Sequence, residues 1–313
     1  MYKIFLTFLI IIVMFCCKNY NPKLTGYLLY IFADTESNYS LYDLRNRKLL
    51  PIKEKLTFVK HSGEPYRLKF GLDKQYLYAN TRDYDIINSK KIYNSKIHCY
   101  SLDKKKYILE FAINNFWIED FQILKNYILV TDKHKILKWN LQTDVKEEIF
   151  YTDNDILSFC YFPKLDKIIL SVNNNSESIA ATIEEINLSN QTHKLIDYSN
   201  IVYYSEKYMK LFYYDEKEEQ FKTYEVEKEI YRVIKLNNEK YMRFGTFITE
   251  DILVVKKKYY TAKYHASLGE LRFYNLNTGE LSETFALPAT VNLGIKMQYV
   301  DYDLNEYFLG ENN

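Results

Sequence analysis

This chain has few glycines, prolines and tryptophans, and its charge is almost balanced. Of its 313 residues, 8 are glycine, 5 are proline and 2 are tryptophan. Lysine and arginine total 42 against 41 aspartate and glutamate, which leaves a net charge of +1. A chain so close to neutral has no overall field that would attract nucleic acid or an anionic membrane surface. We therefore expect no nucleic-acid partner.

Groupings of residues that signal catalysis or metal binding are also missing. The histidines are scattered, and none forms a set with Asp, Glu or Cys at the spacing of metal ligands. No Gly-x-Ser-x-Gly sequence marks a hydrolase nucleophile. We therefore predict no catalytic residue, no metal and no cofactor. The five histidines are His61, His98, His134, His193 and His265, of which His61 and His265 lie in predicted loops.

Two pairs of acidic residues are candidates for a cation site. Glu119 and Asp120 are adjacent, and Asp301 and Asp303 would lie on one face of a strand. Carboxylates in such places could hold a cation if they faced a channel. Acidic residues at the end of a strand are more often simply solvated, so we assign none of them to a site.

The N-terminus resembles a bacterial lipoprotein signal. Lys3 precedes an apolar run from Ile4 to Cys17, and these 14 residues are too few for a membrane span, which needs about 20. In such signals a cysteine directly after the apolar run receives the lipid and becomes the mature N-terminus. Cys17 is the preferred lipid site, because the residue before it should be small, and Phe15 before Cys16 is bulky.

This resemblance divides the chain into three parts. Residues 1–17 are expected to be the signal, 18–25 a tether and 26–313 the folded domain. A membrane-anchored signal and a cleaved, secreted form are the alternatives, and Cys16 is the alternative lipid site. Cys99 and Cys160 lie in apolar strand patterns and should be buried free thiols, unless neighbouring strands allow them to oxidise.

The rest of the chain has the composition and pattern of β-strands. It contains 32 tyrosines, which favour strands, and no stretch sustains an apolar period of 3.6 residues. One pattern recurs: a strand ends in an aromatic or aliphatic, a polar and an aliphatic residue, and then turns. The final aliphatic residues are Leu44, Leu102, Leu141, Leu188, Val226 and Leu276, at separations of 58, 39, 47, 38 and 50 residues.

A period of about 40 to 50 residues with four strands per unit is typical of β-propeller blades. The segment from Gly294 onward holds the first two strands of a unit, and the segment from Gly26 holds the later ones. We therefore expect an all-β, single β-propeller, most simply with six blades, whose ring is closed by the N- and C-terminal strands. Seven blades are the alternative, because the 58-residue first interval could hide a degenerate unit between Tyr84 and Ile97.

Two of the units resemble the repeats of YVTN and tryptophan-aspartate-repeat-like (WD40-like) bacterial propellers. "DKQYLYAN" followed by "IHCYSL", and "LRFYNLNTGELSETF", are similar to their blade pattern, roughly "DGKYLYVAN…VSVID…TGKVVATI". Lys74 stands where that pattern has glycine, and no Trp-Asp dipeptide occurs. The resemblance implies a fold and does not imply an activity.

An exported propeller without catalytic motifs predicts a binding or scaffolding module. The partner would be a protein, peptide or glycan of the bacterial cell envelope, with the chain held at the membrane by its lipid and working as a monomer. The alternative is a lactonase-like or lyase-like propeller enzyme with a polar or metal site on the ring axis. Sialidase boxes, the paired glycines of kelch blades and the glycine and tryptophan richness of quinoprotein propellers are all missing.

Overall fold

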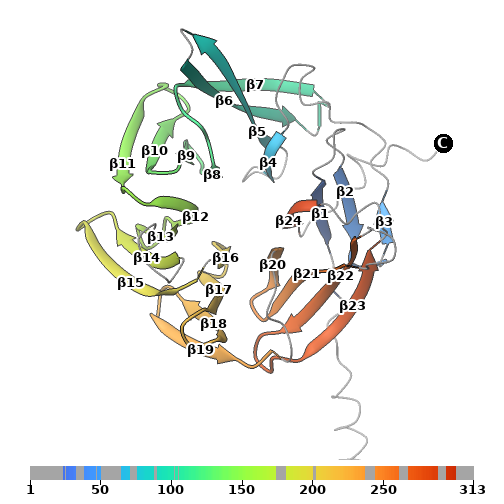
Figure 1. Ribbon diagram of the computed structural model, residues 1–313. Helices are drawn as coiled ribbons and strands as arrows, with labels where there is room; N and C mark the ends of the chain where they lie inside the picture. Colours follow the sequence, from blue (N-terminus) through green and yellow to red (C-terminus); the bar gives the residue numbers. More distant parts are fainter. Residues whose placement is uncertain are drawn as a thin grey trace, which may run out of the picture.

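The computed structural model shows a ring of antiparallel sheets (Figure 1), which confirms the all-β, single β-propeller fold. Its 24 described elements are all strands, and among the described residues no helix is long and apolar enough to cross a membrane. The structure describes residues 24, 26–32, 39–46, 48–50, 65–70, 76–87, 90–101, 103–104, 106–173, 181–199, 202–236, 244–260, 267–287 and 294–300.

Five blades each consist of four strands that follow one another in the chain. The first contains β4 (Pro65–Phe70), β5 (Tyr76–Ile87), β6 (Lys90–Ser101) and β7 (Lys106–Asn114). The second contains β8 (Asp120–Ile123), β9 (Tyr127–Thr131), β10 (Lys135–Asn140) and β11 (Lys146–Tyr151). The third contains β12 (Asp155–Phe162), β13 (Lys167–Asn173), β14 (Ala181–Asn187) and β15 (Thr192–Tyr198). The fourth contains β16 (Val202–Ser205), β17 (Lys210–Asp215), β18 (Gln220–Glu225) and β19 (Ile230–Ile234). The fifth contains β20 (Phe244–Thr249), β21 (Ile252–Tyr260), β22 (Ser267–Asn275) and β23 (Leu281–Leu287).

The ring is closed by a composite sheet made from both ends of the chain. β24 (Gly294–Val300) is its innermost strand and pairs with β1 (Tyr27–Phe32), followed by β2 (Tyr39–Asp43) and β3 (Lys48–Leu50). Closure by N- and C-terminal strands removes the open edges that a linear row of sheets would leave. The C-terminal segment thus supplies one described strand, where the sequence pattern indicated two.

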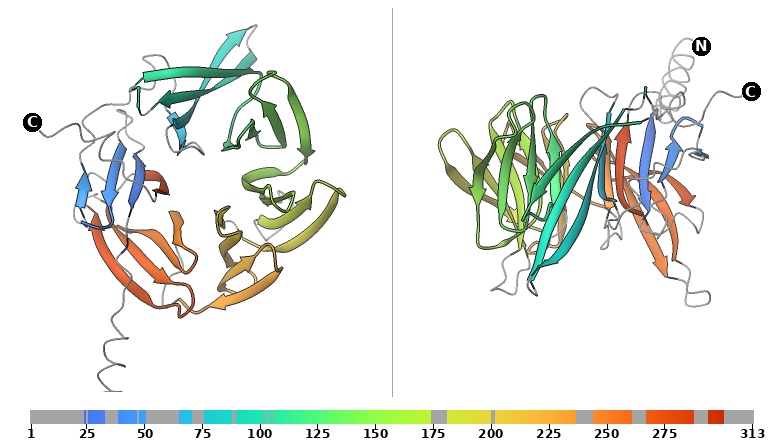
Figure 2. Two further views of the ribbon diagram at one scale, coloured as in Figure 1. Left: turned by 180° about the vertical axis from the view of Figure 1, so that it is seen from behind. Right: turned by 90° about the horizontal axis from the view of Figure 1, so that it is seen from above.

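The blade number expected from the sequence is corrected accordingly. In place of six blades, or seven, the structure has five blades that are continuous in the chain and one composite sheet that closes the ring. In the part of the first interval that the structure describes, there is no additional unit between Tyr84 and Ile97. The extra residues of this interval lengthen the β5–β6 hairpin, which stays paired from Tyr76 with Ser101 to Ile87 with Lys90 and extends beyond its neighbours (Figure 2).

Hydrophobic clusters between neighbouring blades hold the ring together. Phe162 and Ile183 of the third blade pack with Leu211 and Tyr224 of the fourth, and all four side chains are almost completely buried. Corresponding clusters join the first blade to the second, the second to the third, the fourth to the fifth, and the fifth to the composite sheet. Burying one such side chain completely contributes about 1.5–3 kcal/mol to the free energy of unfolding.

The recurring polar–aliphatic pair has a structural role at the turn between the third and fourth strands. In the fifth blade, the Asn275 side chain accepts the N–H groups of Asn277 (2.9 Å) and Thr278 (3.2 Å). The N–H of Leu276 then donates to the carbonyl of Asp251 (2.8 Å), in the turn between the first two strands. The repeat therefore fastens the two turns at one end of the fifth blade; Leu102, the repeat residue of the first blade, lies outside the described residues.

The same tie recurs around the ring. The N–H groups of Leu44, Leu141, Leu188 and Val226 donate to the carbonyls of Gly26 (3.1 Å), Asn126 (3.3 Å), Asp166 (2.9 Å) and Met209 (2.9 Å), respectively. Asp43, Asn140 and Asn187 cap their turns as Asn275 does. In the fourth blade the polar residue is Glu225, whose carboxylate binds cations instead.

Glycine is scarce because other residues occupy most of the positive-φ turn positions. Gly279 has a φ of 74°, and a Cβ there would lie 2.3 Å from the carbonyl oxygen of Lys235. At other hairpin turns, L-residues adopt such a backbone, although each of them costs about 1 kcal/mol. These residues are Asp144, Asp166, Gln191, Met209, Glu219 and Glu229.

Candidate functional site

The outermost strand of the fourth blade, β19, exposes an unusual number of apolar side chains. Ile230 is 49% exposed, Tyr231 43% and Val233 52%, and only Ile234 is buried. β19 lies on the outside of the ring (Figure 1) and pairs with β18 over all five residues. We call residues 230–234 the β19 edge.

Among their described side chains, the other outermost strands expose at most two large apolar residues each: Tyr107 and Ile108 on β7, Tyr151 on β11, Leu195 on β15 and Leu281 on β23. β11 exposes Glu147 and Glu148, and β15 exposes Thr192, His193 and Lys194. Charged and polar side chains on an edge strand discourage pairing with other chains. The β19 edge has Arg232 as its one exposed charge and exposes three large apolar side chains, more than any other outermost strand shows among the described residues.

Tyr231 fastens this edge to the neighbouring blade. Its ring lies 4.9 Å from that of Tyr224, its cross-strand partner on β18. Its hydroxyl donates to the carbonyl of Ile196 on β15 (3.2 Å). Ile196 is the extra residue of a β-bulge, where pairing passes from Ile183–Asp197 to Glu184–Leu195, so its carbonyl is available outside the ladder.

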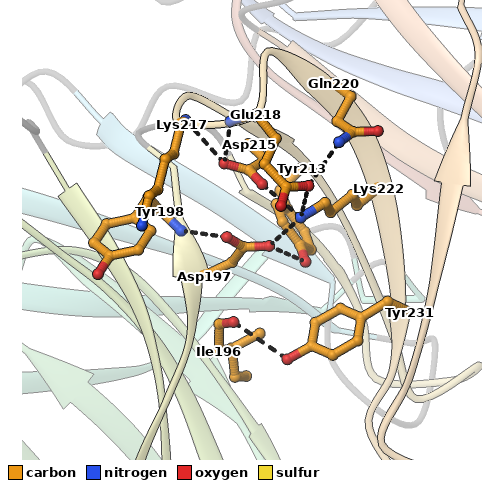
Figure 3. A network of polar contacts seen from close by, with 10 residues as sticks. All are labelled: Ile196, Asp197, Tyr198, Tyr213, Asp215, Lys217, Glu218, Gln220, Lys222 and Tyr231. Atoms are coloured by element: carbon orange, nitrogen blue, oxygen red, sulfur yellow. Dashed lines mark hydrogen bonds and ion pairs between the residues drawn. The ribbon is translucent and has the colours of Figure 1, made fainter.

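Beneath the edge, Lys222 of β18 binds three carboxylates (Figure 3). Its ammonium lies 2.9 Å from Asp197, 2.5 Å from Asp215 and 2.9 Å from Glu218. Burial alone would lower the pKa of Lys222, but the hydrogen bonds to these carboxylates outweigh burial and raise it. Lys222 is therefore a permanent cation that joins β15 to the fourth blade, and it has no free amine for nucleophilic chemistry.

Asp215 and Asp197 are held by further hydrogen bonds. Asp215 is 1% exposed and accepts the N–H groups of Lys217 (2.9 Å) and Glu218 (3.1 Å). Burial acts to raise the pKa of Asp215, and the bonds from Lys222 and these two N–H groups outweigh it and lower the pKa. Asp197 also accepts the hydroxyl of Tyr213 at 2.9 Å. The network thus keeps its buried charges paired.

A second group of charges joins the third and fourth blades at the start of β19. Glu229 lies 2.5 Å from Lys194 and 2.9 Å from Lys167. Hydrogen bonds from Lys194 and Lys167 lower the pKa of Glu229 to about 2. The start of the β19 edge is therefore tied to the third blade, through Glu229 and Tyr231, so its exposed side chains are presented on a rigid support.

Around the ring axis, polar side chains of β8, β12 and β16 bond to one another and to the backbone. The Gln122 carboxamide accepts the N–H of Tyr161 (2.8 Å) and donates to the Tyr161 carbonyl (2.9 Å) and to Glu206 (2.7 Å). Ser158 and the Tyr204 hydroxyl are 3.0 Å apart. These bonds join three consecutive blades.

Of the acidic residues singled out in the sequence, the structure describes Glu119 and Asp120, and neither belongs to a group that could hold a metal ion. Asp120, at the start of β8, is 5% exposed and accepts the N–H of Phe121 (2.9 Å), and Glu119 immediately precedes it. Across the described residues, no three His, Cys, Asp or Glu side chains are grouped so that they could hold a metal ion. Asp301 and Asp303 lie outside the described residues.

Of the three histidines that the structure describes, His98 is the one whose ring contacts both a hydroxyl and a carboxylate. It is 3% exposed, and its ring contacts the Thr81 hydroxyl (2.8 Å) and the Glu110 carboxylate (3.3 Å). A hydroxyl, an imidazole and a carboxylate in series resemble a nucleophile–base–acid arrangement. Here the three groups lie on adjacent strands, and the hydroxyl and the carboxylate are polar partners for a buried imidazole.

The remaining sequence-selected residues are less connected. His134 lies 3.9 Å from Asp155, and the His193 ring lies 5.8 Å from that of Phe150. Cys99 and Cys160 are buried free cysteines, as expected. His61, His265, Cys16 and Cys17 lie outside the described residues.

Sequence reasoning missed the β19 edge and Lys222. A signal for the edge was present, since "EIYRVI" has a single charge after its first residue, whereas "KEEIFY" and "THKLIDY" carry more polar residues. No comparable signal marked Lys222, because its three carboxylates come from different strands and turns.

Comparisons with known proteins identify a fold and no family. No family model matches the chain, and no curated protein matches it. Among solved structures, the chain is similar to a propeller chain in the crystal structure of a nidogen/laminin complex, with a TM-score of 0.57 and 12% sequence identity. The match covers 87% of this chain and 97% of that chain. At this identity the likeness shows the β-propeller fold alone.

Replacing Lys222 by methionine should strongly destabilise the protein. The change leaves Asp215 and Asp197 without their cation, and breaking a buried ion pair in this way costs about 3–5 kcal/mol. Urea unfolding should show this loss, and Lys222→Met/Asp215→Asn should recover part of it. Lys164→Met removes an exposed lysine and serves as the control. Equal stability of the Lys222→Met and Lys164→Met proteins would contradict the role given to Lys222.

Stability should also fall as the pH drops below about 6.5, because of His98. Burial lowers the pKa of His98 from its ordinary 6.5, against the opposing effect of Glu110. Unfolded chains then bind a proton that folded chains do not, so the stabilising contribution is complete above pH 6.5 and is lost below it. Urea midpoints at pH 7.5 and 5.5 should differ for the wild type and differ less for His98→Gln. An unchanged difference in His98→Gln would assign the pH dependence to other groups.

Proposed function

We propose that this chain is a binding or scaffolding module of the bacterial cell envelope. The observation that carries the proposal is the β19 edge, where three apolar side chains are about half exposed on a strand that charged contacts hold in place. Exposed apolar side chains that lie next to one another are characteristic of interaction sites. The propeller supplies the rigid frame, and the partner is a protein, peptide or glycan.

The polar residues near the axis favour this function over an enzymatic one. Gln122, Ser158 and Tyr204 are occupied in bonds that join blades, and burial raises the pKa of the Tyr204 hydroxyl, which keeps it protonated near neutral pH. No observation of the described residues favours the lactonase-like or lyase-like alternative.

Export and lipid attachment complete the proposal. They rest on the sequence alone: Lys3, the short apolar run to Cys17 and the polar segment after it. A lipid on Cys17 would hold the propeller, as a monomer, close to the membrane surface.

One cellular experiment tests both parts of this proposal. A tagged full-length chain is expressed in bacteria with a radiolabelled fatty acid, and intact cells are then treated with a cross-linker. We expect the wild type to carry the label and to form a discrete cross-linked adduct with its partner. Cys17→Ser should lose the label and most of the adduct. Cys16→Ser is the matched control and should keep both. A labelled Cys17→Ser protein would refute the lipid site, and a wild type without any adduct would refute the binding function.

A further inference from the structure

We infer that the β19 edge binds an extended protein segment, which adds to the fourth blade as a fifth strand. The inference rests on the proposed binding function and names its surface and its class of partner. It depends on the backbone of β19, on the side chains at its two faces and on the charges beside it.

The backbone of β19 offers hydrogen-bonding groups along one side. β19 pairs with β18 from Ile230 to Ile234, and no strand in the described part of the chain pairs with its other side. In an antiparallel pair, alternate residues direct both their N–H and C=O groups away from the partner. Such a row of groups is satisfied by another strand and by few other ligands.

The side chains of β19 extend this surface on both faces. Successive residues alternate between the two faces of a sheet, so Ile230 lies on one face, and Tyr231 and Val233 lie on the other. All three are between 43% and 52% exposed. An added strand would cover them with its own alternate side chains, whereas a glycan would leave the backbone row unmatched. The Tyr231 hydroxyl is already bonded to Ile196.

The charge beside the edge favours an acidic segment. Lys228, Arg232 and Lys210 lie 2.7, 3.2 and 3.9 Å from the single carboxylate of Glu225. Lys210 has a second partner, Glu250, at 2.8 Å. Three cations thus share two carboxylates, and the Arg232 side chain is 56% exposed. A carboxylate on the incoming strand opposite Arg232 would give its exposed guanidinium a second carboxylate partner.

The edge is also ordered before a partner arrives. Tyr231 is bonded across the blade boundary, and Glu229 at the preceding turn is held by two lysines. A surface that is already rigid loses little conformational entropy when it binds. This favours the β19 edge over the outermost strands whose exposed side chains are long and charged.

Binding of defined peptides to the full-length protein tests the inference. The probes are nine-residue peptides with alternating apolar and polar positions and a central glutamate, lysine or serine, measured by fluorescence anisotropy. We expect the glutamate peptides to bind best. Ile230→Lys and Val233→Lys place a lysine on the edge and should weaken binding by about tenfold or more. Arg232→Gln should remove the preference for glutamate.

The matched control is Leu281→Lys on β23, because Leu281 is 45% exposed on the outermost strand of another blade. It should bind the peptides as the wild type does, and urea unfolding confirms that each variant is folded. Equal binding by Val233→Lys and Leu281→Lys, or no binding of any peptide by the wild type, would overturn the inference. The cross-linking experiment in cells distinguishes failure of the β19 site from failure of the binding function. A cross-linked adduct that persists in Val233→Lys refutes the β19 site and leaves the binding function standing.

Discussion

The architecture depends on a hydrogen bond that ties two turns of a blade together. The N–H of the recurring aliphatic residue, such as Val226 or Leu276, donates to a carbonyl in the turn between the first two strands. The bond fixes the two turns relative to each other, and the aliphatic side chain then packs between blades: Val226 and Leu276 both belong to inter-blade clusters. Local turn geometry and long-range packing therefore meet at one residue.

Much of this could be predicted from the sequence because it is local and repeated. Asn275 before Leu276 and Asp43 before Leu44 are turn-forming residues at a constant offset from a buried position, so the period of the ring is visible without coordinates. The composite sheet was also foreseeable, since the two ends of the chain carry complementary strands. Hairpin length was not, because Tyr76–Ile87 could equally continue one strand or begin another unit.

The candidate site was hidden for a physical reason. Tyr231 meets Ile196, and Lys222 meets Asp197, across a blade boundary whose register is set by a β-bulge. Bulges are not evident from alternation of polar and apolar residues. Near the ring axis, the sequence drew attention to a different residue from the one that joins the blades. Asp120 stood out as an acidic residue, yet it is the nearby Gln122 that bonds to residues of two other blades.

The features that repeat from blade to blade and the proposed binding site are therefore different parts of this molecule. The tied turns and inter-blade clusters are shared by the blades and have a structural role, whereas the β19 edge is where the fourth blade differs from the rest. Its Glu225 stands where other blades have a turn-capping Asn, Asp or Ser, and it binds the cations that flank the edge.

Hydrogen exchange of the isolated full-length protein, followed residue by residue, tests this separation most directly. The amides of Leu44, Leu141, Leu188, Val226 and Leu276 should be protected, because each is bonded within its blade. Alternate amides of β19 should exchange quickly, because nothing pairs with that side of the strand in the described chain. Rapid exchange of the turn amides, or protection of every amide of β19, would contradict the proposed separation of frame and binding edge.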